Sequence, residues 1–346
     1  MTKLIASILL VLLLCLPASA AEFSAPEVPD SGSSLMPSET QNFGSGMAEL
    51  LKKAFLLIRP DLSEALRLAA GLIASVILVS ALRSFSGISK GTVTLTGAVI
   101  VSIQLLSSAN SMLRLGCDTI NELSNYGKLL LPVMAAALAA QGGVTASASL
   151  YVGTTAFDTV LSSLIARLFT PMVLVFIAIG IAVYALGDET LKKLQELVKG
   201  IVTWSLKTIL IAYTAYMGIT GVVSGTTDAA ALKAAKLTIS TVVPVVGGIL
   251  SDASEAVLVS VGTMKNAAGV YGILAAAAIF LEPFLKIGAH YLVLKGTGAV
   301  CTVLDPKGMG GLIDVFSSAM GLILAMTGAC CLLVLISTVC FLRSMN

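Results

Sequence analysis

Long runs of apolar residues recur along most of this chain and constrain its fold more than any other feature. Runs long enough, or nearly so, to cross about 30 Å of hydrocarbon at about 1.5 Å per residue lie near 62–82, 92–113, 144–166, 169–186, 201–224, 268–289 and 312–341. The chain is 57% hydrophobic and 12% charged, whereas a soluble domain is about 25% charged. The sequence therefore predicts an all-α, polytopic helical membrane protein with six to eight spans.

Charge and residue usage exclude several classes of function. A net charge of +2 provides no basic surface for nucleic acid. The chain has one histidine and no CxxC pair among its six cysteines, so neither a metal nor another cofactor is expected. Gly87–Gly91 matches GxSxG in spacing, but it joins two predicted spans rather than a strand and a helix. We therefore expect no enzyme, and any dependence on ATP must come from a partner.

The first 60 residues predict a processed, extracytoplasmic N-terminus. Residues 1–20 have the charged, apolar and small-residue regions of a secretory signal, with cleavage expected after Ala20. Residues 21–46 are polar and rich in proline, and predict a flexible lead. Residues 47–60 have apolar positions at helical spacing, typical of a helix on the membrane surface or of one packed on its own protein.

Prolines and paired glycines interrupt two shorter apolar segments, 129–142 and 241–251, which predict broken or re-entrant helices. Two proline pairs share a separation of 39 residues, and the pairs are offset by 112 residues. This spacing predicts two related units, 127–224 and 239–341, after a first hairpin and connector at 62–126. Such interruptions either line a transport pathway or serve helix packing alone. The expected helix breaks are Pro132, Gly142, Gly143, Pro171, Pro244, Gly247, Gly248 and Pro283.

Lysines and arginines in short connectors predict the orientation of the spans. The connector 187–200 carries Lys192, Lys193 and Lys199, which favours the cytoplasmic side. Arg83 and Lys90, after the first span, fit the same side if the mature N-terminus is outside.

Ionisable residues within apolar runs are the candidates for a functional site, because each is costly at membrane depth unless paired or hydrated. Glu282, Lys286 and His290 recur every four residues and form one stripe along a helix. This stripe is either a structural interhelical ion pair or a polar pathway. Further candidates are Asp158 and the pair Asp252 and Glu255, for which a solvated position at the membrane interface is the favoured alternative to a pathway.

Residues 242–272, VVPVVGGILSDASEAVLVSVGTMKNAAGVYG, closely resemble the stage III sporulation protein AE family of endospore-forming bacteria. The signal peptide, the polar lead, Leu131-Pro132-Val133, Gly142-Gly143 and the C-terminal apolar span agree with the layout of that family. The resemblance implies a permease-like, multipass subunit of the channel complex between mother cell and forespore, located in the mother-cell membrane that surrounds the forespore. It also implies partners, namely the other subunits of that complex, including a separate secretion-type ATPase. The alternatives are a non-conducting scaffold of the complex and, third, an independent ion-coupled transporter.

Overall fold

A computed structural model describes residues 26–38, 43–85, 90–140, 144–219, 267–304 and 309–344. Within these ranges every regular element is helical. The elements are α2 (Asp30–Ser33), α3 (Phe43–Phe85), α4 (Lys90–Ala140), α5 (Val144–Leu164), the π-helix η1 (Ile165–Phe169), α6 (Thr170–Leu186), α7 (Glu189–Ile219), α10 (Ala267–Leu304) and α11 (Met309–Ser344). Six of the helical stretches described are long and apolar enough to cross a membrane, which confirms the predicted fold class.

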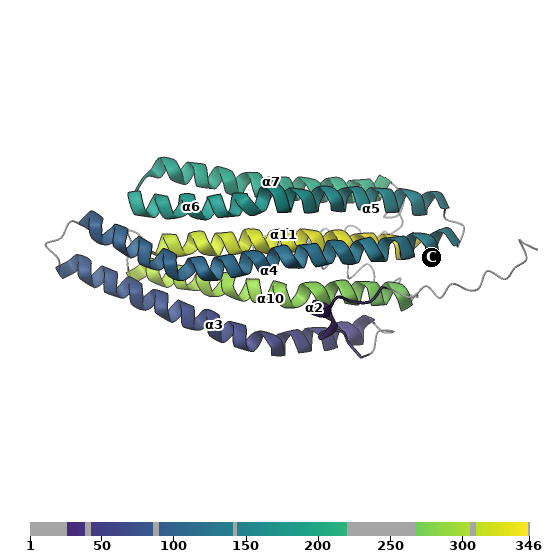
Figure 1. Cartoon of the computed structure of the whole chain (residues 1–346), viewed down its shortest axis with the longest axis horizontal. Coiled ribbons are helices and arrows are strands. Elements are labelled where there is room, and N and C mark those ends of the chain that lie inside the picture. Colours follow the sequence, from purple (N-terminus) through teal and green to yellow (C-terminus); the bar gives the residue numbers. More distant parts are fainter. Residues whose placement is uncertain are drawn as a thin grey trace, which may run out of the picture.

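The long helices form one elongated, antiparallel bundle (Figure 1). α11 lies at its centre, between α10 on one side and α5, α6 and α7 on the other, with α4 packed along it. The most apolar window of α11 has a mean hydropathy of 2.5 and is 94% buried. A helix that is apolar on all sides needs cover on all sides, so α11 forms the core.

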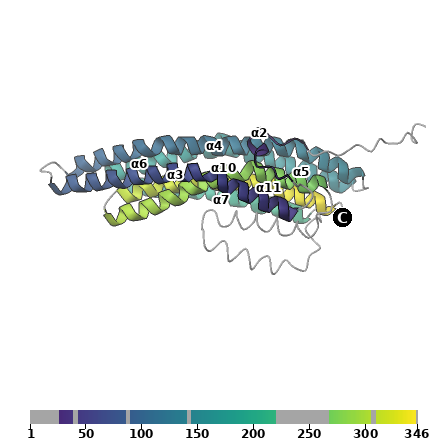
Figure 2. The same ribbon diagram turned by 90° about the horizontal axis from the view of Figure 1, so that it is seen from below.

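The helices are much longer than a bilayer requires. At about 1.5 Å per residue, the 43 residues of α3 extend about 64 Å and the 51 residues of α4 about 76 Å. The hydrocarbon core is about 30 Å thick. The tip of the α3–α4 hairpin extends beyond the ends of the other helices in both views (Figures 1 and 2).

Two predicted spans, 144–166 and 169–186, form one continuous helical stretch, because α5, η1 and α6 follow one another without a turn. No glycine interrupts residues 154–179, and Pro171 stands in the first turn of α6, where its missing N–H costs little. The stretch ends at Gly187, whose φ of 73° favours glycine and whose N–H donates to the Val183 carbonyl at 2.8 Å. The prediction of two spans here was wrong.

The expected breaks at Pro132 and Pro283 are also absent, since α4 and α10 run through these prolines. Neighbouring helices and local adjustment make proline tolerable inside such helices. Residues 47–60 likewise belong to the continuous helix α3 rather than to a separate element. Pro244, Gly142, Gly143, Gly247 and Gly248 lie outside the described residues, so the internal repeat stays a prediction.

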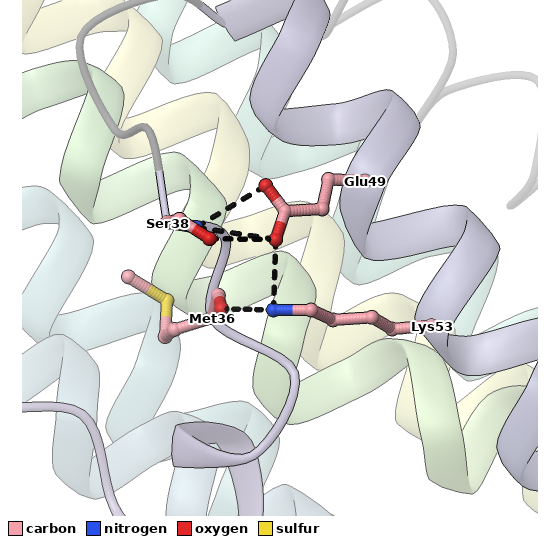
Figure 3. A network of polar contacts seen from close by, with 4 residues as sticks. All are labelled: Met36, Ser38, Glu49 and Lys53. Carbon is pink, nitrogen blue, oxygen red and sulfur yellow. Dashed lines mark hydrogen bonds and ion pairs between the residues drawn. The ribbon is translucent and has the colours of Figure 1, made fainter.

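Residues 26–38 pack as a strap against the bundle, in contrast to the flexible lead expected for 21–46. Leu35 is fully buried, and Gly32 lies against Ile279 of α10. Figure 3 shows the polar contacts that hold the strap to α3: Lys53 donates to the Met36 carbonyl at 2.8 Å and pairs with Glu49 at 2.9 Å. The backbone N–H of Ser38 donates to the same Glu49 carboxylate.

Candidate functional site: polar groups on both sides of the central helix

An ion pair joins α3 to α10 on one side of α11. Lys286 Nζ lies 2.6 Å from Asp61 Oδ1, and the two side chains are 32% and 16% exposed. Asp61 is placed by the helical register of α3, because it stands seven residues after buried Ala54 and four before buried Ala65. The carboxylate therefore faces α10, where Lys286 meets it.

The rest of the α10 stripe lies in different surroundings from one end to the other. Glu282 is half-buried, and no hydrogen bond or ion pair is found for it within the described part of the chain. His290 is 3% exposed, and its Nδ1–H donates to the Lys286 carbonyl at 3.0 Å. The stripe thus runs from a half-buried carboxylate, through an interhelical ion pair, to a buried imidazole.

A second polar cluster lies between α4, α5 and α7, on the opposite side of α11. Asp158 is 5% exposed, and Ser124 of α4 donates to its Oδ2 at 2.8 Å. Ser162, one turn further along α5, donates to Ser124 at 3.3 Å. The sequence favoured a solvated interface position for Asp158, whereas the structure buries it among hydroxyl groups.

The same face of α5 continues to a buried tyrosine. Thr154, four residues before Asp158, lies 3.4 Å from the hydroxyl of Tyr213 on α7. Tyr213 is fully buried and donates to the Leu333 carbonyl of α11 at 3.4 Å. The hydroxyl and carboxyl groups of α5 thus connect α4, α7 and α11, which is the usual way for polar side chains to join helices in a membrane.

The structure brings together some of the predicted site residues and separates others. Glu282, Lys286 and His290 share one helix, but Asp158 lies across α11 from them. Asp252 and Glu255 lie outside the described residues, so the idea that they share a cavity with the stripe stays a prediction.

Sequence reasoning missed Asp61, Ser124 and Tyr213, the partners that the two clusters depend on. For Asp61 the signal is its place in the buried register of α3, and for the other two no local pattern marks the contact. Within the described ranges, no three His, Cys, Asp or Glu side chains are grouped closely enough to hold a metal ion.

The fold and these clusters define a multipass helical membrane protein whose ionisable groups join helices to one another. A sequence profile of the stage III sporulation protein AE family matches residues 34–344, and the chain belongs to this family. Stage III sporulation protein AE of Bacillus subtilis (strain 168) is 23% identical over 238 residues, which cover 68% of this chain and 59% of that relative. The chain thus spans about three fifths of the length of the relative. No solved structure matches it.

Proposed function

We propose that this protein is an integral membrane subunit of the channel complex between mother cell and forespore that endospore formation requires. Membership of the sporulation family and the six membrane-capable helices support this proposal. The other subunits, including a separate secretion-type ATPase, are its proposed partners. Its proposed location is the mother-cell membrane around the forespore.

The proposed orientation places the mature N-terminus outside the cytoplasm. The α3–α4 tip, with Arg83 and Lys90, and the turn at Gly187 before Lys192 and Lys193 lie at one end of the bundle (Figure 1). The positive-inside rule favours the cytoplasm for that end. The strap and the C-terminal end of α11 lie at the other end, on the proposed extracytoplasmic side.

One observation favours an assembly role for this subunit over conduction through its centre: the most apolar window of α11, on the axis of the bundle, is 94% buried, and α11 packs on neighbouring helices. An aqueous route along that axis would expose apolar side chains to water. We therefore propose that the subunit holds the complex together as a scaffold, and that transport takes place along its outer faces or through partners.

A permease-like role is the second candidate, and the α10 stripe is the observation that favours it. Glu282 and Lys286 are both partly exposed and stand one turn apart on the same helix. Partly exposed charges at such spacing can line a hydrated route between subunits.

Substitution of Lys286 separates the two roles. In a scaffold, Lys286→Met removes the partner of Asp61, destabilises the α3–α10 contact and lowers the amount of protein in the membrane. Loss of one member of a fully buried pair costs about 3–5 kcal/mol, and the 32% exposure of Lys286 makes a smaller loss the expectation. In a conduit, the protein remains abundant while spore formation fails.

Two further variants serve as controls. Lys295→Met breaks the exposed pair of Lys295 with Asp314, which are 52% and 46% exposed, and should leave both abundance and spore formation unchanged. The charge exchange Asp61→Lys with Lys286→Asp should restore abundance if the pair is structural. Single cysteines at 282, 286 and 290 that react with a membrane-impermeant maleimide, together with normal abundance and failed spore formation for Lys286→Met, would refute the scaffold in favour of the conduit.

A further inference from the structure

Asp158 is a buried acid within a helical stretch that is apolar enough to cross a membrane. The stretch is Ala146–Leu186, and the Asp158 side chain is 5% exposed. An acid in such surroundings is costly unless it is paired, hydrated or protonated. The groups around Asp158 distinguish these three possibilities.

Asp158 has no bound counter-ion. None of the ion pairs found within the described ranges includes it. Lys128, one turn after Ser124 on α4, acts on the carboxyl electrostatically, but its side chain is exposed. In the described helices α7 and α11, the titratable groups that face Asp158 are the hydroxyl of Tyr213 and the thiol of Cys330. Both groups carry no charge at neutral pH, so these surroundings favour the protonated form of the acid.

A row of hydroxyl groups leads from the carboxyl toward the surface of the bundle. Ser124 Oγ donates to Asp158 Oδ2 at 2.8 Å, and Ser162 Oγ donates to Ser124 Oγ at 3.3 Å. Ser124 is buried, whereas Ser162 is partly exposed. Because both hydrogen bonds point inward, each hydroxyl can pass its proton to the next oxygen and accept another from the side of the surface. The row therefore provides a path for a proton to the buried carboxyl.

The backbone beside this row is unusual. The π-helix Ile165–Phe169 begins three residues after Ser162 and separates α5 from α6. Such turns inside α-helices are rare and occur frequently at functional sites. A hydrogen bond that only joins α4 to α5 needs no π-helix, so this turn is an independent indication of a site.

Packing alone does not require an acid at position 158. An asparagine has nearly the same shape, and its carbonyl oxygen can accept the hydrogen bond from Ser124. Uncharged polar side chains of this kind join helices in membranes. What aspartate adds is a proton that can be bound and released.

We propose that Asp158 is a proton-binding site that is protonated in the folded protein at neutral pH and exchanges its proton with water through Ser124 and Ser162. In uptake, Ser124 passes its proton to the carboxylate and Ser162 passes its own to Ser124. A hydronium ion then gives a proton to Ser162 and leaves as water, and release runs in reverse. The site does not depend on the proposed role in the channel complex, and its tests do not use spore formation.

Infrared spectra of the purified full-length protein test the charge state of Asp158. A protonated carboxylic acid has a C=O stretching band that is separate from the bands of carboxylate and amide groups. We expect this band at neutral pH in the unaltered protein, and its loss or weakening in Asp158→Asn. Asp118→Asn is the matched control, because Asp118 is an exposed acid of α4, and it should leave the band unchanged. An unchanged band in Asp158→Asn would overturn the site.

A carbodiimide provides a second measurement that needs no variant. Dicyclohexylcarbodiimide is apolar and adds the O–H of a protonated acid across one of its C=N bonds. The adduct rearranges to a stable N-acylurea, and no group leaves. Mass spectrometry should find this adduct on Asp158 at neutral pH, and less of it as the pH is raised. The absence of an adduct at Asp158 would overturn the site.

The path through the hydroxyl row is tested by the rate of proton release. After a rapid rise in pH, the infrared band should decay severalfold more slowly in Ser162→Ala than in the unaltered protein. Ser163→Ala, at an exposed neighbouring serine, should decay at the unaltered rate. Equal rates for Ser162→Ala and the unaltered protein would refute the path.

Discussion

Gly97 of α4 provides a sharp test of the packing between the first two long helices. Gly97 lies against Val79 of α3, a residue that is 3% exposed. A Cβ added at 97 would come 2.7 Å from Val79 Cγ1 and 3.1 Å from Cγ2. Carbon atoms normally meet at about 3.5–4.0 Å, so Gly97→Ala forces a displacement of close to 1 Å.

Val79 cannot easily rotate out of the way. A β-branched side chain in a helix has one strongly preferred χ1 rotamer, and both of its methyl groups face the new Cβ. The groove beside the contact, which Val79 and Gly97 line, gives α3 some room to shift. Overpacking of this kind costs about 1–3 kcal/mol, and the groove makes the lower half of that range the expectation.

Gly71→Ala is the matched control. Gly71 stands inside α3, and a Cβ there would meet nothing within 4 Å. Replacement of glycine by alanine in a helix stabilises by about 1 kcal/mol from propensity alone. Both variants gain that contribution, so the difference between their free energies of unfolding isolates the packing cost of about 1–2 kcal/mol.

Thermal unfolding of the detergent-solubilised protein measures this difference. Cys301, Cys330, Cys331 and Cys340 are buried thiols outside any disulfide, so a thiol-reactive fluorescent dye reports when the bundle opens. We expect Gly97→Ala to unfold about 2–6 °C below Gly71→Ala. The double variant Gly97→Ala with Val79→Ala should lose the unfavourable coupling, because the methyl groups that clash are gone. Equal unfolding temperatures for Gly97→Ala and Gly71→Ala would refute the close approach of the two helices.

Three further outcomes follow from the contacts and the sequence. Ser124→Ala removes the donor to buried Asp158 and should cost about 1–3 kcal/mol of stability. The dye should then label this variant at a lower temperature than the unaltered protein. The control Ser63→Ala, at an exposed serine of α3, should leave the labelling temperature unchanged. Lys53→Met removes the contact to the Met36 carbonyl and should speed proteolysis of the strap while the dye assay stays unchanged; an unaltered digestion rate would contradict the role of Lys53. N-terminal sequencing of the membrane-embedded protein should begin at Ala21, and an intact Met1 would reverse the proposed orientation.

The sequence sufficed to predict an all-helical membrane protein because apolar runs are local. It failed where two helices of ordinary span length continue into each other. Ile165–Phe169 form a π-helix between α5 and α6, and a search for spans of about 20 residues divides such a stretch in two. The absence of any glycine from residues 154–179, together with the position of Pro171 where a continuing helix tolerates it, was the signal that could have prevented the error.

The sites were predictable only in part, since each depends on a contact between distant segments. The spacing of Glu282, Lys286 and His290 indicated a shared face of one helix, and the helix is there. The partner of Lys286 is Asp61, on the first long helix; its place in the buried register of α3 marks it as facing another helix, but nothing in the sequence pairs it with Lys286. Asp158 appeared as a lone acid in an apolar run, and only the packing of α4 on α5 shows that Ser124 covers it.

Hydropathy also misjudges which helices face lipid. The most apolar window, in α11, has a mean hydropathy of 2.5 and is 94% buried, whereas the window of α3 has a mean hydropathy of 2.2 and is 28% buried. Hydropathy measures the cost of contact with water, and the interior of a protein removes that cost as well as lipid does. What distinguishes the two helices is their neighbours: among the described helices, α11 contacts α4, α5, α6, α7 and α10, whereas the main contacts of α3 are with α10 and α4. The outer helices therefore determine which surface the protein offers to lipid, and α11 holds those helices in place.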